Sequence, residues 1–141
     1  QVVLLGKPEG LGRWVGGPKG LWWVARLGLA SWAGKKVEDL SKGMQQKVQF
    51  IGSLLNDPDL VILDEPFSGL DPVNSQVMKD VVVEIAREGR TVLFSTHIME
   101  QSEKMCDRIV ILAQGVKMID VPLAQITRAE YGDGQFTLAL M

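Results

Sequence analysis

The clearest hydrophobic pattern in the chain is helical and follows Ser41. Four apolar residues recur there at intervals of four, three and four positions, so they share one face of a helix: Met44, Val48, Ile51 and Leu55. Ser41 is a favoured N-cap residue, because its hydroxyl can accept a backbone N–H that has no partner within the first turn. The sequence therefore predicts an amphipathic helix over residues 41–55.

A second amphipathic helix is predicted to begin after Asp71. Pro72 fits the first helical position, where the backbone N–H that proline lacks would have no partner within the helix. Gly89 fits the end of the helix, because glycine readily adopts the left-handed conformation that is common there. The apolar face of this helix consists of Val77, Val81 and Ile85.

Two short apolar runs, Leu60–Asp64 and Thr91–Ser95, alternate with these helices. Continuous apolar runs of this length are typical of strands that are buried on both faces of a sheet. A short helix is predicted over Ile98–Met105, and a hairpin over Arg108–Leu112 and Val116–Asp120. The order of helices and strands predicts an α/β fold whose central strands are parallel.

Residues 1–36 differ in composition from the rest of the chain. They contain all four tryptophans and many of the glycines, and glycine at this density interrupts regular elements. Only Gly20–Leu29 leaves room for a short helix. We therefore expect residues 1–36 to be largely irregular.

The overall composition is that of a globular domain. The chain has 141 residues, of which 46% are hydrophobic and 23% charged, enough for one domain with its own core. The net charge of −2 argues against a basic nucleic-acid surface. A single cysteine, Cys106, excludes an internal disulfide, and no apolar run approaches the roughly 20 residues that span a bilayer. Because the chain begins with Gln1 rather than methionine, we expect a fragment or a processed product.

Acidic residues and a histidine follow the two predicted strands. Asp64 and Glu65 end the first strand, and His97 comes shortly after the second. The carboxyl ends of parallel strands meet at one edge of a sheet, where α/β proteins bind ligands. There Asp64 could hold Mg²⁺, Glu65 could orient or deprotonate a water, and His97 could donate to a phosphate oxygen. Taken alone, these residues are better explained by an ordinary polar turn after a strand and by a structural histidine.

The segment LSKGM, residues 40–44, is a candidate anion site. A helix that begins after Ser41 presents free backbone N–H groups and the positive end of its dipole. Gly43 would let the backbone approach a phosphate closely, and Lys42 adds positive charge. Taken alone, the segment is better explained as the start of an ordinary capped helix.

Taken in order, these motifs resemble the second half of an ATP-binding-cassette (ABC) ATPase domain, from about Val37 to Tyr131. LSKGM is similar to the family's signature motif LSGGQ, with Lys42 and Met44 in place of Gly and Gln. LVILDEP resembles the Walker B strand with its catalytic glutamate, SGLD resembles the D-loop, and His97 matches the switch histidine. The surrounding sequence is most similar to the sodium- and drug-export branch of the family.

This resemblance implies a fold and a division of the chain. The fold would be α/β, a partial P-loop NTPase (RecA-like) core with parallel central strands, preceded by part of the ABC helical subdomain and followed by a β-hairpin. Residues 1–36 would be a remnant of the helical subdomain. Residues 37–131 would be the C-terminal part of the ATPase domain, and residues 132–141 the start of a C-terminal extension.

The resemblance also implies ATP and Mg²⁺ as ligands and a role for each motif residue. Asp64 would coordinate Mg²⁺, while Glu65 would position the attacking water and His97 would contact the γ-phosphate. In this family two domains sandwich two ATP molecules, so the signature residues would bind the nucleotide of a second subunit and the D-loop would link the two sites. The residues concerned are Ser41, Lys42 and Gly43 in the signature and Asp71 in the D-loop.

The implied partners are a membrane-spanning permease subunit and a second ATPase subunit, in a homodimer or heterodimer, but no nucleic acid. The protein would then lie in the cytoplasm, peripheral on the inner face of the plasma membrane. The sequence contains no P-loop (G-x-x-x-x-G-K-S/T), so we expect this truncated form to hydrolyse no ATP alone. Two other hypotheses stay open: a soluble ABC-type ATPase of DNA repair or translation, and a non-catalytic interaction fragment.

Overall fold

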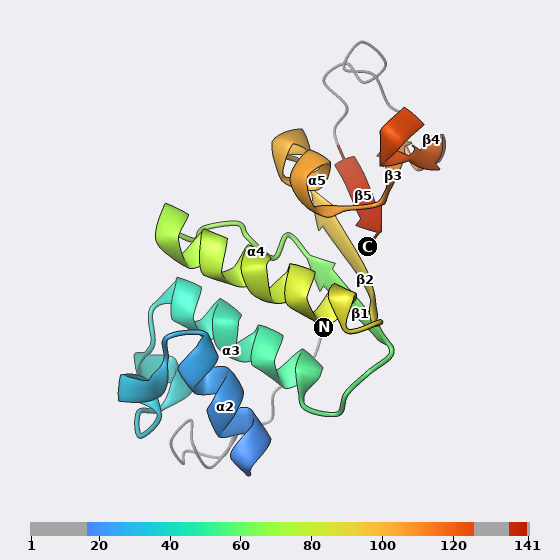
Figure 1. The fold of residues 1–141 in the computed structure, drawn as a ribbon. Helices are drawn as coiled ribbons and strands as arrows, with labels where there is room; N and C mark the ends of the chain where they lie inside the picture. Colours follow the sequence, from blue (N-terminus) through green and yellow to red (C-terminus); the bar gives the residue numbers. More distant parts are fainter. Residues whose placement is uncertain (1–16, 126–135, 141) are drawn as a thin grey trace. The chain divides into compact units, whose positions relative to one another are not determined.

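The structure is a computed structural model that describes residues 17–125 and 136–140. The chain divides into two compact units (Figure 1). We call residues 1–58 and 69–78 the helical unit, and residues 59–68 and 79–141 the sheet unit. None of the described helices combines the length and the apolar character that a membrane crossing requires.

The helical unit is built from helices alone in its described part. Both of its longer helical segments contribute buried apolar residues. Those in or next to the first include Trp23, Val24 and Leu27, and those in the second are Val48, Phe50, Ile51 and Leu54. Two of its helices, α2 and α3, contact each other and lie side by side in Figure 1. Its elements are α2 (Pro18–Arg26), η1 (Ala30–Trp32), η2 (Val37–Asp39), α3 (Lys42–Leu54) and the first half of α4 (Pro72–Arg87).

Helix α2 confirms the short helix that was predicted within residues 1–36. It begins two residues earlier than expected, with Pro18 in the first turn. Gly28, at a φ of 72°, ends it: its N–H donates to the Ala25 carbonyl at 3.0 Å, and the Leu29 N–H donates to the Val24 carbonyl at 2.8 Å. This pair of bonds is the Schellman arrangement, in which glycine supplies the left-handed residue.

Helix α3 confirms the predicted helix after Ser41, with a correction to its buried face. The Ser41 hydroxyl accepts the Met44 N–H at 3.3 Å, so Ser41 is the N-cap. Leu54 is fully buried, whereas Leu55, predicted to lie on the apolar face, is only partly buried. Lys47 is also buried, although its side chain carries a charge.

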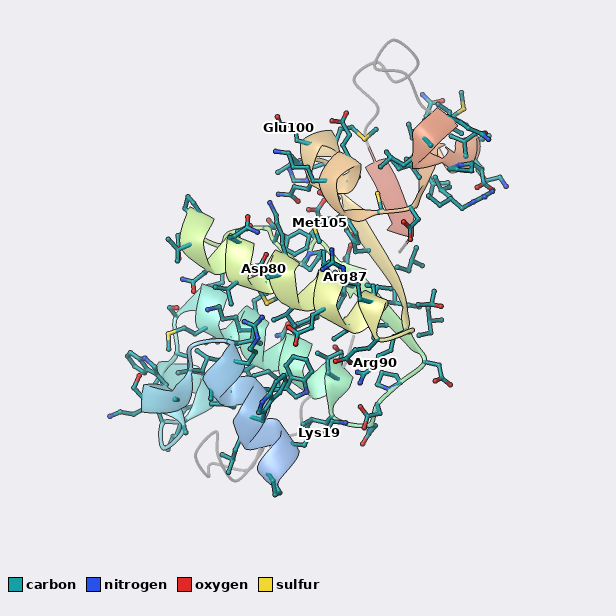
Figure 2. All side chains as sticks on the ribbon, viewed as in Figure 1. Lys19, Asp80, Arg87, Arg90, Glu100 and Met105 are labelled. Carbon is teal, nitrogen blue, oxygen red and sulfur yellow. The ribbon has the colours of Figure 1, made fainter. Side chains whose placement is uncertain are left out.

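One side chain ties the start of α2 to the end of α3. Lys19, labelled in Figure 2, forms an ion pair with Asp57 and donates a hydrogen bond to the Leu55 carbonyl at 3.2 Å. A cation near the last carbonyls of a helix also interacts favourably with the helix dipole. Lys19 thus stabilises the packing of these two helices within the helical unit.

The sheet unit contains a mixed five-stranded sheet in the order β1-β2-β5-β3-β4. Strands β1 and β2 are parallel, as predicted, and β3 and β4 form the predicted antiparallel hairpin around Gln114 and Gly115. The unit also holds the second half of α4, and α5 confirms the predicted short helix. Its remaining elements are β1 (Leu60–Asp64), β2 (Thr91–Thr96), α5 (Met99–Met105), β3 (Arg108–Ala113), β4 (Val116–Pro122), η3 (Leu123–Gln125) and β5 (Phe136–Leu140).

Strand β5 was not predicted. It pairs antiparallel with both β2 and β3 and so joins the parallel pair to the hairpin. Its two neighbours come from distant parts of the sequence, and such pairing leaves no local pattern of its own. The parallel strands therefore form one side of a mixed sheet, within an α/β fold.

The prediction that β1 is buried on both faces is wrong. Val61 and Leu63 are buried, but Leu60 is 52% and Ile62 is 66% exposed. Strand β1 is the last strand in the order of the described sheet, and the face that carries Leu60 and Ile62 is open to solvent. An apolar run shows that a strand can be buried on both faces, but it does not supply the layer that covers the second face.

Candidate functional site

The first candidate site lies where β1 and β2 end in the sheet unit. Asp64 and Ser95 are paired in the register of these strands. The Ser95 hydroxyl donates to Asp64 Oδ1 at 2.5 Å and accepts the backbone N–H of Glu65 at 3.0 Å. The Ser95 hydroxyl therefore fixes both the carboxylate of Asp64 and the backbone of Glu65.

The second carboxylate contacts the histidine that follows β2. Glu65 Oε1 lies 2.7 Å from His97 Nδ1, and because a carboxylate only accepts, Nδ1 carries the proton. Glu65 has a φ of 45°, in the left-handed region that residues other than glycine rarely adopt. Glu65 adopts this conformation directly after β1. The neighbouring carboxylates have different partners: Asp64 contacts Ser95, and Glu65 contacts His97. The structure thus brings the three predicted residues Asp64, Glu65 and His97 into one cluster with Ser95, the strand-end cluster.

The strand-end cluster fits a magnesium ion that is only partly bound by protein. Asp64 is exposed and lies beside the Ser95 hydroxyl, so the two offer hard oxygen ligands at one point. Among the described residues there is no group of three or more acidic, histidine or cysteine side chains that could enclose a metal. Magnesium keeps several waters and is commonly held by one or two carboxylates together with substrate phosphates. The available donors match that mode of binding.

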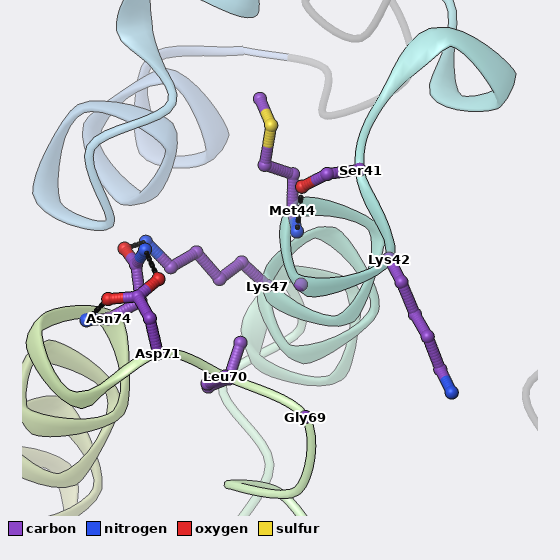
Figure 3. Close-up of a pocket in the computed structure, with 9 residues that line it drawn as sticks. Ser41, Lys42, Met44, Lys47, Gly69, Leu70, Asp71 and Asn74 are labelled. Atoms are coloured by element: carbon purple, nitrogen blue, oxygen red, sulfur yellow. Dashed lines mark hydrogen bonds between the residues drawn. The ribbon is translucent and has the colours of Figure 1, made fainter.

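The second candidate site is a pocket of about 340 Å³ in the helical unit. It lies at the start of α3 and beside the turn that precedes α4 (Figure 3). We call it the α3 pocket. Its lining contains all four of the remaining predicted site residues together with five others: Ser41, Lys42, Gly43, Met44, Lys47, Gly69, Leu70, Asp71 and Asn74.

Three of these residues shape the pocket at the first turn of α3. Ser41 already accepts the Met44 N–H, so its hydroxyl is held in place. Lys42 is exposed, and Figure 3 shows its side chain pointing away from Asp71 and Asn74. A Cβ at Gly43 would lie only 3.0 Å from Leu70 Cδ2, so a side chain at this position would have to displace that methyl group.

Asp71 is the N-cap of α4. Its Oδ1 accepts the backbone N–H groups of Val73 at 3.1 Å and Asn74 at 3.0 Å, and its Oδ2 accepts the side-chain amide of Asn74. The Asn74 side chain, followed by these backbone N–H groups, holds the pKa of Asp71 below its usual range. The helix that the sequence predicts to begin after Asp71 thus begins there, with Asp71 as its cap.

Sequence reasoning missed three residues of these sites: Ser95, Lys47 and Asn74. The signal for Lys47 was present, because it is three positions after Met44 and four before Ile51 and so lies beside the predicted apolar face. Ser95 could be found only from the register that pairs it with Asp64. Asn74 was hidden within an ordinary first helical turn.

Comparison with known proteins matches the chain to a family model and to curated relatives. Residues 36–100 match a family model described as "AAA domain, putative AbiEii toxin, Type IV TA system". The chain is 40% identical over 129 residues to an uncharacterized ABC transporter ATP-binding protein of Alkalihalophilus pseudofirmus, covering 92% of this chain and 48% of that relative. It is 42% identical over 120 residues to a fluoroquinolones export ATP-binding protein of Mycobacterium tuberculosis, covering 79% of this chain and 40% of that relative.

A solved structure shows the same fold. A protein described as "an inward-facing conformation of a putative metal-chelate type ABC transporter" superposes with a TM-score of 0.69 at 20% identity, over 86% of this chain and 55% of that chain. The fold is therefore that of an ABC-type ATP-binding domain. The chain belongs to the family of ABC transporter ATP-binding proteins, and it spans about half the length of the curated relatives described above.

Proposed function

We propose that this chain is the part of an ABC exporter's ATP-binding subunit that carries the signature motif and the catalytic carboxylates. The subunit would couple ATP hydrolysis to transport across a membrane. The observation that supports this most directly is the strand-end cluster, in which Asp64, Glu65 and His97 are linked by short hydrogen bonds. The similarity to a fluoroquinolones export protein supports export as the direction.

Each residue of the strand-end cluster has a distinct task in this proposal. Bound ATP with Mg²⁺ supplies the phosphoryl group that is transferred to water. Asp64 holds the metal, and Ser95 orients the Asp64 carboxylate. Glu65 orients the attacking water through a carboxylate that is already fixed by its contact with His97. When the imidazole carries both protons, His97 donates from Nδ1 to Glu65 and offers Nε2–H to a phosphate oxygen.

In the same proposal the α3 pocket receives the terminal phosphate of a nucleotide held by a second subunit. The first turn of α3 offers backbone N–H groups and the positive end of the helix dipole. Ser41 and Gly43 lie at this turn, and Lys42 adds positive charge nearby. Asp71 lines the same pocket and would link the two nucleotide sites of the dimer.

The proposed partners are a second ATP-binding subunit and a membrane-spanning permease. The subunit would lie on the cytoplasmic side of the membrane, bound to the permease. We further propose that the 141-residue chain does not turn over ATP alone, because none of its glycine-rich segments has the spacing of a P-loop.

The test is a full-length subunit in which this sequence is joined to a P-loop. Glu65→Gln should reduce phosphate release by about 100-fold or more, since it removes a positioned base. It should also leave ATP bound and trap a closed dimer, which size-exclusion chromatography with ATP and Mg²⁺ detects. Glu100→Gln, at an exposed position of α5, is the matched control and should change neither result.

Two outcomes would contradict the proposal. Turnover near the wild-type rate in the Glu65→Gln subunit would remove Glu65 from the chemistry. A Glu65→Gln subunit that binds ATP but remains monomeric would argue against the two-subunit sandwich, and with it the role of the α3 pocket.

A further inference from the structure

The α3 pocket contains a buried cation to which the proposed function assigns no role. Lys47 is only 4% exposed, although a buried ammonium loses its hydration. Its Nζ donates to the Leu27 carbonyl at 2.8 Å and to the side-chain oxygen of Asn74. Burial lowers the pKa of Lys47, and the nearby Asp71 opposes that shift. Such a charge is retained at a cost in stability, which makes its partners informative.

The second partner of Lys47 leads directly to Asp71. The Asn74 amide has an oxygen that accepts and a nitrogen that donates, and each end has a neighbour (Figure 3). The oxygen faces Lys47, and the nitrogen donates to Asp71 Oδ2. An ammonium can only donate and a carboxylate can only accept, so both neighbours require the same orientation of the amide.

We infer that Lys47 is a positioning residue for Asp71, and that it acts through the orientation of the Asn74 side chain. Leu27 anchors the ammonium, the ammonium fixes the amide oxygen, and the amide nitrogen then fixes the second carboxylate oxygen. The first carboxylate oxygen is already held by the backbone of α4. The three hydrogen bonds that the Asp71 carboxylate accepts from Val73 and Asn74 are thus all supplied within the helical unit.

This inference rests on the proposed function only for the use that Asp71 is put to. The relay itself is a property of the chain without nucleotide or partner. It predicts that a neutral, non-donating side chain at position 47 frees the amide to rotate. The amide nitrogen would then be held toward Asp71 by the carboxylate alone, so the hydrogen bond from the Asn74 side chain to Asp71 would be weakened.

The test measures the pKa of the Asp71 carboxyl by NMR titration of the 141-residue protein. Lys47→Met has a similar length and no donor, and it should raise the pKa of Asp71 toward that of an ordinary aspartate. Lys47→Arg, which can only donate, should keep the pKa depressed. Lys19→Met removes a cation from the same unit without touching Asn74, and it should leave the pKa of Asp71 unchanged.

A second pair of variants separates the relay from the direct attraction between the two charges. Lys47→Met is repeated in an Asn74→Leu background, where the relay no longer exists. The relay predicts that the additional rise in the pKa of Asp71 is clearly smaller there than in the protein with Asn74. An equal rise in both backgrounds would show that Lys47 acts by its charge alone and would overturn the inference.

The single variant Asn74→Leu keeps the inference testable if Lys47→Met does not fold. It removes the side-chain donor to Asp71 without adding a charge, so the pKa of Asp71 should rise. An unchanged titration of Asp71 in the Asn74→Leu protein would also overturn the inference. None of these measurements involves ATP, so a failure of the ATPase proposal and a failure of the relay give different results.

Discussion

The strand-end cluster and the α3 pocket achieve local order in different ways. In the strand-end cluster, the candidate side chains contact one another: Ser95 contacts Asp64, and His97 contacts Glu65. In the α3 pocket, Ser41 and Asp71 instead accept backbone N–H groups and cap the helices α3 and α4, and Asp71 accepts the Asn74 side chain in addition. The first arrangement consists mainly of contacts between side chains at the ends of two strands, whereas the second uses side chains that also cap helices.

This difference indicates at which residues a mutation can change ligand binding without also changing the stability of the fold. Asp64 and His97 are exposed, so changing their charge should alter ligand binding with little effect on folding. Changing Ser41 or Asp71 removes a cap, so any loss of function will be accompanied by a loss of stability. The following predictions test this contrast, beginning with the largest expected effect.

The largest effect is expected for Asp64→Asn in the full-length subunit. Replacing a carboxylate by an amide weakens the only proposed protein ligand of Mg²⁺ that carries a charge, so nucleotide affinity in the presence of Mg²⁺ should fall about 10-fold or more. In EDTA, the nucleotide affinity of the Asp64→Asn subunit should equal that of the wild type. Asp59→Asn, an exposed acid that precedes β1, is the matched control for fluorescence titration of nucleotide. A similar loss with and without metal would mean that Asp64 acts on the fold rather than on the ion.

The second effect concerns stability in the helical unit. Asp71→Ala removes the acceptor of two backbone N–H groups at the start of α4, and it should lower the free energy of unfolding by about 1 to 2 kcal/mol. Denaturant unfolding of the 141-residue chain measures this difference. Asp64→Asn in the same chain should change it by less than about 0.5 kcal/mol. If the two variants were equally destabilised, the contrast between the two sites would be lost.

A smaller loss is expected for Ser41→Ala. The bond from the Met44 N–H is 3.3 Å long and exposed, so the change should reduce the free energy of unfolding by about 0.5 to 1 kcal/mol, the lower part of the range for N-caps. Ser41→Asp, which retains a capping acceptor, should restore the stability. A loss of the same size in both variants would exclude capping as the stabilising role of Ser41.

The smallest effect is a difference in how acid affects two aspartates. The folded-state pKa values of Asp71 and Asp120 are both lowered, so each contributes stability above the pKa of an unfolded aspartate and loses it as the pH falls through the folded value. The donors to Asp71 are uncharged, whereas Asp120 pairs with Lys117 and Arg108. Added salt should therefore weaken the contribution of Asp120 more than that of Asp71.

The measurement is acid unfolding of Asp71→Asn and Asp120→Asn at low salt and at about 1 M salt, where the Debye length is about 3 Å. The difference between wild type and Asp120→Asn should shrink in salt, and the difference between wild type and Asp71→Asn should persist. Equal salt sensitivity would show that net charge, rather than the local donors, controls Asp71.

Most of the local elements could be predicted because their signals are local. Ser41, Pro72 and Gly89 mark helix ends through backbone rules that hold in any fold, and Gly115 marks the hairpin turn. The Gly89 N–H, for example, donates to the Ala86 carbonyl at 3.0 Å with a φ of 95°. The order of strands with Asp64, Glu65 and His97 also sufficed to place these three together.

What could not be predicted depends on contacts between distant segments. Strand β5 lies between β2 and β3, and nothing in residues 136–140 names those partners. The roles of Ser95 and Lys47 follow from strand register and helix packing, which fix where a polar group finds its partner. The exposure of Ile62 depends on whether a layer covers β1, a property that no single strand encodes.

The open face and edge of β1 have a practical consequence for handling the isolated chain. Leu60 and Ile62 present apolar side chains on a short strand that has one described neighbour, β2. Apolar strands at a sheet edge recruit further strands from other molecules, and LVILD contains no proline and only a terminal charge to oppose this. Concentrated samples of the chain should therefore self-associate through this strand. The substitution Ile62→Lys would place a charge in this strand and oppose such pairing. It should keep preparations monomeric without altering either candidate site.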